Sequence, residues 1–468
     1  MENFYLMDLV NAVDGSFIIG NPHLPINDIS IDTRTIKEGS LFFAIKGKSL
    51  DGHDYIKEAI EKKVSAIVYS RDDIKFENMF PTIPSLVKVQ DTSLALEKLA
   101  AAYRKRFNLL QTIAITGSNG KTTTKEMLAS ILSQKGKTLS NKGNFNNRIG
   151  VPLTLFNLTS DMEYAAIEIG TSEFGEIKVL TDIITPFCGI ITNIGNSHLE
   201  FFKTPENVLK EKRTLIDGIS SDGFIVLNND NEYLKTIIPQ TSKKVITFGL
   251  YNGADVYAKN IKLWLDKPLF DMYIDGNKET IELPIKGKFN IYNALAAATA
   301  AYGLGFSFKE IKEGLAKCTP PKMRMQAQTL GNGAIIVNDA YNANPTSMKE
   351  SIKSLSQSYP DRDVILVLGD MLELGENSPQ YHAEIGKYIN TLDFVKSVYL
   401  FGDLVNHIKN EITDKKTEFF ISKKILCEEI MQHITENSLV FIKGSRGMKL
   451  DEVYNELITI DKIKRGIK

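Results

Sequence analysis

The sequence predicts an α/β protein of three domains, in which helices cover parallel sheets. Three observations support this fold class. The chain has 468 residues, about three times the length of an ordinary domain. From about residue 110 onward, short apolar runs alternate with segments of helical periodicity, the pattern of successive βαβ units. A loop carrying Pro320 and Pro321 interrupts this alternation, which then restarts.

These interruptions place domain boundaries near residues 108 and 318. Residues 1–108 hold shorter pieces with glycine turns and predict a smaller N-terminal α/β domain. Residues 109–317 predict a central P-loop-type sheet with flanking helices, and residues 318–468 predict a C-terminal Rossmann-like α/β domain. We expect strands at residues 112–115, 164–169, 188–194, 224–227 and 245–248, and again at 334–337, 364–368, 398–401 and 439–442.

Two helices of the central domain can be placed from periodicity and capping signals. After Lys121, one helical face collects Met127, Leu128, Ile131 and Leu132. We expect Gly136 to be the C-cap of this helix. A second helix covers residues 290–302, and Asn290 is suited to be its N-cap.

Composition excludes several classes of partner. Fifty-six basic and fifty-seven acidic side chains nearly cancel, so nothing in the charge balance favours nucleic acid or an anionic membrane. The three cysteines are far apart and odd in number, which fits a reducing compartment. The N-terminus lacks the cationic start of a secretory signal, and no apolar run exceeds five residues. We expect a cytoplasmic protein that does not insert into membranes and is a monomer.

The strongest local signal is a glycine-containing loop between a buried strand and an amphipathic helix. Its residues are Thr116, Gly117, Ser118, Asn119, Gly120, Lys121, Thr122 and Thr123. Such a loop can direct backbone N–H groups and a helix N-terminus at one anion. Lys121 then supplies a positive charge for the β and γ phosphates, and Thr122 a hydroxyl for Mg²⁺. The spacing departs from the common GxxxxGK[ST] pattern, and the alternative is a turn that binds nothing. We favour a nucleoside triphosphate.

Two polar residues follow at the ends of predicted strands, where open α/β sheets bind ligands. Glu168 interrupts an otherwise apolar strand, so it should meet a cation, and Mg²⁺ is a suitable one. A solvated strand end or a lysine partner is the alternative. His198 follows the next strand and is a candidate for metal or phosphate contact, although an isolated histidine is more often structural.

Further motifs extend over essentially the whole chain. They are residues 30–34 and 51–55 in the first domain, 143–147 and 149–152 in the second, and 339–345, 368–371, 373–375 and 443–447 in the third. Together with the phosphate loop, Glu168 and His198, this combination resembles the Mur ligases, ATP-dependent amide ligases that build the peptide stem of peptidoglycan. Each motif alone is weak, but the combination is highly specific.

The resemblance implies roles for individual residues. The UDP moiety and the sugar-peptide path would be contacted by Ser30, Asp32, Arg34, Lys46, His53, Asn144, Asn146 and Asn147. Mg²⁺ would be held by Thr122, Glu168, His198 and a carbamylated Lys212, and catalysis would use Lys121, Lys212 and His198. ATP would also be contacted by Asn290 and Asn293 at adenine, Arg324 at the γ-phosphate and Asp339 at ribose. The incoming dipeptide would meet Tyr341, Asn344, Lys443 and Arg446.

Several of these residues have ordinary alternatives. The alternation of Asp32 and Arg34 suits a solvent-facing strand, and Lys212 alone would be read as a solvated helix lysine. Phe289 stands where many relatives have histidine. Arg446 could brace its loop by pairing with Asp370 or Glu373 instead of binding the dipeptide carboxylate.

The implied reaction joins D-alanyl-D-alanine to UDP-N-acetylmuramoyl-tripeptide through an acyl phosphate, with ATP and Mg²⁺. The third domain would close over ATP and exclude water. One competing hypothesis is the sister ligase that adds the third amino acid, which typically carries an Asn/Asp-Pro-Arg motif; here Pro345 is followed by Thr346. Folate polyglutamate ligases are a second, but they are not expected to have the motifs at 32–34 and 51–53. A nucleotide-hydrolysing switch is a third.

Overall fold

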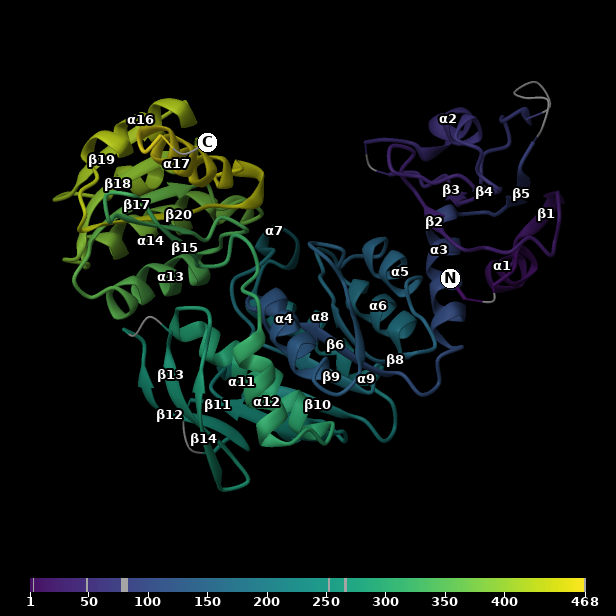
Figure 1. Cartoon of the computed structure of the whole chain (residues 1–468), viewed down its shortest axis with the longest axis horizontal. Helices are drawn as coiled ribbons and strands as arrows, with labels where there is room; N and C mark the ends of the chain where they lie inside the picture. The colour runs from purple at the N-terminus through teal and green to yellow at the C-terminus, as the bar shows by residue number, and fades with distance from the viewer. Residues whose placement is uncertain (3, 48, 77–82, 251–252, 265–266, 467–468) are drawn as a thin grey trace.

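The structure is a computed structural model that describes residues 1–468 except 3, 48, 77–82, 251–252, 265–266 and 467–468 (Figure 1). Within the described residues, the strands form three sheets, and each sheet falls inside one of the three predicted domain ranges. The architecture confirms the α/β fold class. The sheets are mixed rather than purely parallel, because each carries at least one antiparallel strand at an edge.

The first sheet has the strand order β1-β5-β4-β3-β2, and only β1 runs antiparallel to its neighbour. Its strands are β1 (Ser16–Ile19), β2 (Ile29–Ser30), β3 (Leu41–Phe43), β4 (Ala66–Tyr69) and β5 (Ser85–Lys88). The accompanying helices are α1 (Leu6–Val13), η1 (Gly52–Tyr55), α2 (Ile56–Glu61) and α3 (Thr92–Arg104). The alternative prediction that Asp32 and Arg34 lie on a solvent-facing strand is wrong, since both lie in a turn after β2.

The central sheet has the order β14-β13-β12-β11-β10-β9-β6-β8-β7, parallel from β7 to β12 and antiparallel in β13 and β14. Its strands are β6 (Gln111–Thr116), β7 (Lys137–Ser140), β8 (Met162–Glu168), β9 (Cys188–Ile191), β10 (Phe224–Asn228), β11 (Lys244–Gly249), β12 (Val256–Lys262), β13 (Leu269–Ile274) and β14 (Asn277–Glu282). All five predicted strands are present, although β9 ends three residues early. The sequence prediction missed β7 and the extension β12–β14.

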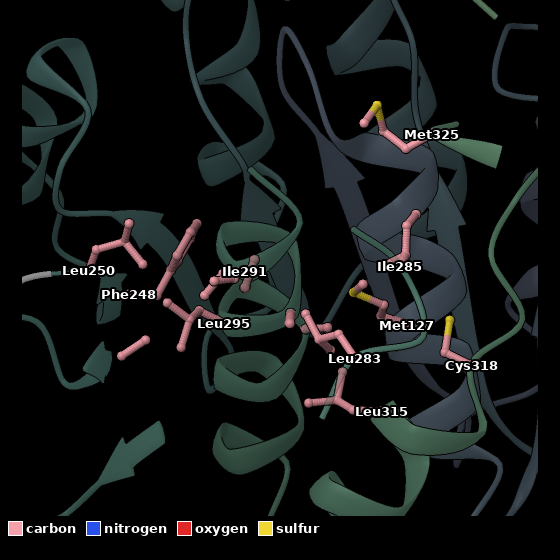
Figure 2. Close-up of a cluster of buried hydrophobic side chains, with 14 of the residues drawn as sticks. Met127, Phe248, Leu250, Leu283, Ile285, Ile291, Leu295, Leu315, Cys318 and Met325 are labelled. Atoms are coloured by element: carbon pink, nitrogen blue, oxygen red, sulfur yellow. The ribbon is translucent and has the colours of Figure 1, made fainter. Parts of the chain in front are cut away.

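Helices cover both faces of the central sheet. They are α4 (Lys121–Leu132), α5 (Gly150–Leu155), α6 (Glu176–Ile184), α7 (Leu199–Phe202), α8 (Pro205–Lys212), α9 (Thr214–Asp217), α10 (Glu232–Ile237), η3 (Ile238–Gln240), α11 (Lys288–Gly303) and α12 (Phe308–Lys317). The predicted apolar face of α4 packs against α11 and α12, and Figure 2 shows Met127 in the same buried cluster as Ile291 and Leu315.

Both predicted helix caps are wrong. The first helix ends at Leu132 with Ser133 as its C-cap, three residues before Gly136. The second begins at Lys288 after Gly287, whose φ of 103° suits glycine. Asn290 is therefore inside the first turn, where its Nδ2 donates to Lys286 O at 2.7 Å instead of capping the helix.

The third sheet has the order β15-β16-β20-β17-β18-β19, with only β15 antiparallel. Its elements are β15 (Gln326–Thr329), β16 (Ile335–Asn338), α13 (Pro345–Ser358), β17 (Asp363–Gly369), η4 (Gly375–Asn377), α14 (Ser378–Asn390), β18 (Val395–Phe401), α15 (Asn406–Lys409), β19 (Lys416–Phe420), α16 (Lys423–His433), β20 (Ser438–Lys443), η5 (Arg446–Met448) and α17 (Asp451–Lys464). The four strands predicted here are confirmed.

The first and central domains are joined by polar contacts as well as by apolar packing. Helix α3 packs on α5 and α6, and Arg148 forms two hydrogen bonds to Glu97 at 2.6 and 3.0 Å. Tyr103 donates its hydroxyl to Leu158 O at 2.8 Å. The third domain follows a connecting segment, residues 318–325. None of the helices in the described part of the chain is long and apolar enough to span a membrane.

Candidate active site between the central and third domains

The described residues line two adjoining cavities between the carboxyl ends of the central and third sheets, of about 710 and 430 Å³. Of the predicted site residues, the larger cavity is lined by Ser118, Asn119, Gly120, Lys121, Asn144, Asn146, Asn147, Glu168, His198, Arg324, Tyr341, Asn344 and Arg446. The smaller is lined by Asn119, Gly120, Thr123, Asn293, Arg324, Asp339 and Lys443. Asn119, Gly120 and Arg324 line both, so they mark the junction of the two cavities.

The phosphate loop is held in place by the segment after β9. Ser118 N and Asn119 N donate to Asn193 O and Asn193 Oδ1 at 2.9 and 3.0 Å, and Thr192 Oγ1 donates to Asn119 O at 2.6 Å. Gly120 has a φ of 83°, and a Cβ there would collide with the side chain of Asn293. The glycine therefore serves both the turn and the close approach of α11.

Lys121 and Arg324 place two positive charges near the cavity junction. Lys121 Nζ donates to Gly117 O at 2.9 Å, a neutral acceptor, and burial lowers the pKa of this lysine. No carboxylate of the described chain pairs with Arg324, and its Nε is buried without a hydrogen-bond partner. Half-buried cations that lack an anionic partner are unfavourable, so this junction is suited to a polyanion.

Two oxygen atoms near the loop fit a hard divalent cation. Thr122 Oγ1 and Glu168 Oε2 are both buried and have no hydrogen-bond partner among the described residues. The other Glu168 oxygen, Oε1, accepts from Asn146 Nδ2 at 2.8 Å, which orients the carboxylate. Hydroxyl and carboxylate oxygens are ligands that Mg²⁺ accepts, usually together with water and phosphate oxygens. The described chain contains no cluster of three or more His, Cys, Asp or Glu side chains that could hold a metal.

His198 has a partner that the sequence did not indicate. Its Nδ1 lies 2.7 Å from Glu373 Oε2, a carboxylate from the third domain, and this contact lowers the pKa of Glu373. From the sequence, Glu373 was a member of the 373–375 motif and an alternative partner of Arg446. The pair joins the central domain to the third at the wall of the larger cavity.

Lys212 is not a solvated helix lysine. It is the last residue of α8 and is buried, with 1% of its surface exposed. Burial lowers its pKa well below 10.5, the neighbouring Lys121 charge lowers it further, and Glu211 and Glu168 oppose the shift. In the described structure its Nζ has neither a hydrogen bond nor an ion pair, and it lines neither cavity.

Asn141 is a positioning residue that the sequence prediction missed. It is buried at the end of β7, where Oδ1 accepts from Glu168 N at 2.9 Å and Nδ2 donates to Glu168 O and Phe145 O, both at 2.8 Å. The amide thus links the end of β8 to the loop of residues 143–147. No clear signal in the sequence marked this role, because the preceding strand β7 is mostly polar.

Helix α11 brings only one of its two predicted adenine contacts to a cavity. Asn293 lines the smaller one, whereas Asn290 is buried behind it and accepts from Asn293 Nδ2 at 2.9 Å. Thr116 is also buried and lines neither cavity. Asp339 is engaged within the third domain, since its oxygens accept from Met325 N, Ser351 Oγ and Lys443 Nζ.

The predicted UDP contacts of the first domain lie outside both cavities. Ser30, Asp32 and Arg34 form a local turn in which Arg34 pairs with Asp32 at 2.6 Å, and Lys46 is exposed. His53 is buried, with Nδ1 2.6 Å from Asp51 Oδ1 and Nε2 accepting from Ser70 N at 3.0 Å. Because the backbone N–H must be the donor, the ring proton resides on Nδ1 and both ring nitrogens are used internally.

The predicted dipeptide contacts are divided between the cavities. Tyr341, Asn344 and Arg446 line the larger cavity, and Lys443 lines the smaller. Arg446 pairs with Asp451 at 2.8 Å, so the bracing partners suggested from sequence, Asp370 and Glu373, are wrong. Asp370 instead accepts from two backbone N–H groups after β18.

Comparison with known proteins agrees with this arrangement. Three family models match in chain order: the Mur ligase family catalytic domain at residues 25–106, the Mur ligase middle domain at 115–301 and the Mur ligase glutamate ligase domain at 323–446. The chain belongs to the Mur ligase family. This confirms the resemblance drawn from the motifs.

Two relatives of this Mur ligase are named UDP-N-acetylmuramoyl-tripeptide–D-alanyl-D-alanine ligase. The one from Bacillus subtilis is 33% identical and aligns over 92% of this chain and 93% of its own length. The one from Escherichia coli is 34% identical over 98% and 99%. Among solved structures, MurF from Acinetobacter baumannii superposes with a TM-score of 0.88 at 29% identity over 97% and 99% of the two chains. MurF from Thermotoga maritima in complex with ADP gives 0.83 at 27% over 94% and 98%.

Proposed function

We propose that this Mur ligase joins D-alanyl-D-alanine to UDP-N-acetylmuramoyl-tripeptide, consuming ATP and releasing ADP and phosphate. The observation that carries the proposal is the cavity junction, where the phosphate loop, Lys121 and the unpaired Arg324 face one another across two domains. Full-length relatives with this activity in their names support the choice of substrates. Pro345-Thr346, without a following arginine, disfavours the ligase that adds the third amino acid.

In this mechanism the smaller cavity takes the nucleoside and the larger takes the two reacting groups. The substrate carboxylate attacks the γ-phosphate at the junction, and the dipeptide amine then displaces phosphate from the acyl phosphate. Lys121 and Arg324 neutralise the charge on the transferring group, the main requirement of phosphoryl transfer. Thr122 Oγ1 and Glu168 Oε2 would hold Mg²⁺, which supplies further charge neutralisation when bound.

The remaining predicted roles complete the proposal. Residues 1–108 would bind the UDP moiety, residues 109–317 ATP, and residues 318–468 the dipeptide while closing over ATP. Asn144, Asn146 and Asn147 on the wall of the larger cavity would line the sugar-peptide path. We further propose that the protein works as a monomer in the cytoplasm.

The direct test is ADP release by the purified chain. We expect release to require UDP-N-acetylmuramoyl-tripeptide and D-alanyl-D-alanine together, and single amino acids to replace the dipeptide poorly. Lys121→Ala should fold normally and abolish release, because the phosphate loses its nearest cation. ADP release from ATP alone, at the rate seen with both substrates, would instead indicate a nucleotide-hydrolysing switch.

The magnesium assignment has its own test. Glu168→Ala should shift the magnesium titration of activity to higher concentration as well as lower the maximal rate. Exposed Glu163 on the same strand provides a matched control, and Glu163→Ala should leave the titration unchanged. A wild-type magnesium response in Glu168→Ala would return Glu168 to a structural role.

A further inference from the structure

Arg324 lies on the wall shared by the two cavities without any anionic group to hold it. Within the described residues its guanidinium forms no ion pair, and Nε is buried without a hydrogen bond. Its charged neighbours include two cations: burial lowers the pKa of Lys121 and of Lys443, and the Arg324 charge contributes to both shifts. Repulsion from these lysines and a long flexible side chain would both allow the guanidinium to leave the junction.

The contact that opposes this movement is the face of Tyr341. The guanidinium carbon of Arg324 lies 4.1 Å from the centre of the Tyr341 ring. This is well inside the distance of about 6 Å at which a cation is attracted to an aromatic face. A partly desolvated contact of this kind changes an equilibrium by about three- to thirtyfold.

The ring is carried by a turn whose backbone is fixed. Tyr341 follows β16, where Ala340 N donates to Asn338 Oδ1 at 3.1 Å. On the other side, the buried Lys443 Nζ donates to Asn342 O at 3.1 Å. Because both neighbours of Tyr341 are tied to the third domain, the ring can serve as a fixed support.

The backbone on either side of Arg324 is also fixed, although its conformation is uncommon. Its two neighbours, Met323 and Met325, have φ values of 57° and 50°, a left-handed conformation that is uncommon for methionine. Met325 N is held by Asp339 Oδ1 at 3.1 Å, and Met323 N by Gln326 Oε1 at 3.1 Å. These bonds fix the main chain and leave the direction of the Arg324 side chain to its contact with Tyr341.

We propose that Tyr341 is a positioning residue whose ring face directs Arg324 at the γ-phosphate of the bound nucleotide. This inference rests on the proposed function, in which a triphosphate occupies the junction. It assigns the role to the ring rather than to the hydroxyl, for which no hydrogen bond is seen within the described part of the chain. The two parts of the side chain can be separated, because phenylalanine keeps the ring whereas leucine removes it.

The test compares the affinities of a non-hydrolysable ATP analogue and of ADP, measured by calorimetry in magnesium buffer. Their ratio reports the contact with the γ-phosphate and does not require turnover. We expect Tyr341→Phe to keep the wild-type ratio within about twofold and Tyr341→Leu to reduce it by about three- to thirtyfold. Arg324→Ala should reduce the ratio at least as much.

A double-mutant cycle shows whether Tyr341 acts through Arg324. In the Arg324→Ala background, Tyr341→Leu should have no further effect on the ratio. Additive losses, a wild-type ratio in Tyr341→Leu, or equal losses in the Phe and Leu variants would overturn the proposal. Tyr341→Met, which also lacks an aromatic face, replaces the Leu variant if that protein fails to fold.

Turnover measurements add a second readout. If Tyr341 directs Arg324, Tyr341→Leu should lower kcat and leave the KM for D-alanyl-D-alanine within about twofold. A raised dipeptide KM with an unchanged nucleotide ratio would assign Tyr341 to dipeptide binding and overturn the proposal. Failure of the proposed function would be seen separately, as a wild-type protein that binds neither nucleotide or releases no ADP with both substrates.

Discussion

Lys212 at the end of α8 and Lys443 at the end of β20 are both almost completely withdrawn from solvent, with 1% and 2% of their surfaces exposed. Lys443 Nζ lies 2.6 Å from Asp339 Oδ2 and also donates to Asn342 O. Lys212 has no such anion or acceptor among the described residues, and its pKa is lowered well below 10.5. Burial alone therefore does not define a lysine's role, and the presence or absence of a partner separates the two.

The difference has a chemical meaning. A buried lysine paired with a carboxylate keeps its charge and holds structure together. A buried lysine without a partner favours the neutral amine, which is the nucleophilic form. This is the state that reacts with carbon dioxide to give a carbamate, so the surroundings of Lys212 suit the carbamylation that the family resemblance implies for it.

The largest expected effect concerns the activity of Lys212 variants. Lys212→Ala should lower turnover by about a hundred- to a thousandfold, because the site loses a preorganised charge. Small carboxylates such as formate or acetate should partly restore ADP release by standing in for the carbamate. Lys210→Ala, which alters an exposed lysine of the same helix, is the control and should remain active. A fully active Lys212→Ala variant would show that Lys212 has no chemical role, contrary to the comparison with Lys443.

The second expected effect is on stability and runs in opposite directions at the two sites. Lys443→Met should lower the free energy of unfolding by about 3–5 kcal/mol, because it leaves the Asp339 charge buried and unpaired. Lys212→Met should be neutral or stabilising, because it removes a buried amine that has no partner. Urea denaturation of both variants measures the contrast. Adding Asp339→Asn to Lys443→Met should recover most of the lost unfolding free energy. Equal losses of unfolding free energy in Lys443→Met and Lys212→Met would contradict the distinction between the two lysines.

A third cation extends the comparison to a half-exposed position. Arg446 pairs with Asp451 at the edge of the larger cavity. We expect Arg446→Ala to raise the KM for D-alanyl-D-alanine about tenfold, equivalent to ~1.4 kcal/mol, and to leave the KM values for ATP and the UDP substrate unchanged. Asp451→Asn keeps the guanidinium and serves as the control. Equal losses for all three substrates, or a lower melting temperature, would assign Arg446 to bracing.

The parallel core of the fold could be predicted because buried parallel strands are continuous apolar runs. The hairpin β13–β14 was missed although its turn, Asp275-Gly276, is a strong hairpin signal, with φ values of 48° and 75° at the two residues. Neither strand alternates regularly between apolar and polar residues, since β13 reads Leu-Phe-Asp-Met-Tyr-Ile and β14 reads Asn-Lys-Glu-Thr-Ile-Glu. The turn signal was therefore present, but the strands beside it had no clear strand pattern.

Other features could not be predicted from local sequence. The pairing of His198 with Glu373 joins residues from two domains and depends on how those domains pack. The burial of Lys212 depends on tertiary contacts, since its neighbours Lys210 and Arg213 suggest a solvated helix. Asn290 has the residue type of a helix cap, yet Gly287 takes that position because the chain needs a positive φ there. The phosphate loop was found because its chemistry is contained in eight consecutive residues.

The side chain of Asn344 uses both ends of one amide. Oδ1 accepts from Ser347 N and caps α13, while Nδ2 donates to Asn119 Oδ1 of the phosphate loop at 2.9 Å. Serine, threonine or aspartate could replace the cap but would offer the loop no amide donor, and glutamine could reach the loop but is a poor cap. An N-cap position usually accepts serine, threonine, aspartate or asparagine, but position 344 is restricted to asparagine. We therefore expect substitutions among related proteins to be rarer at position 344 than at the other helix N-caps of the third domain.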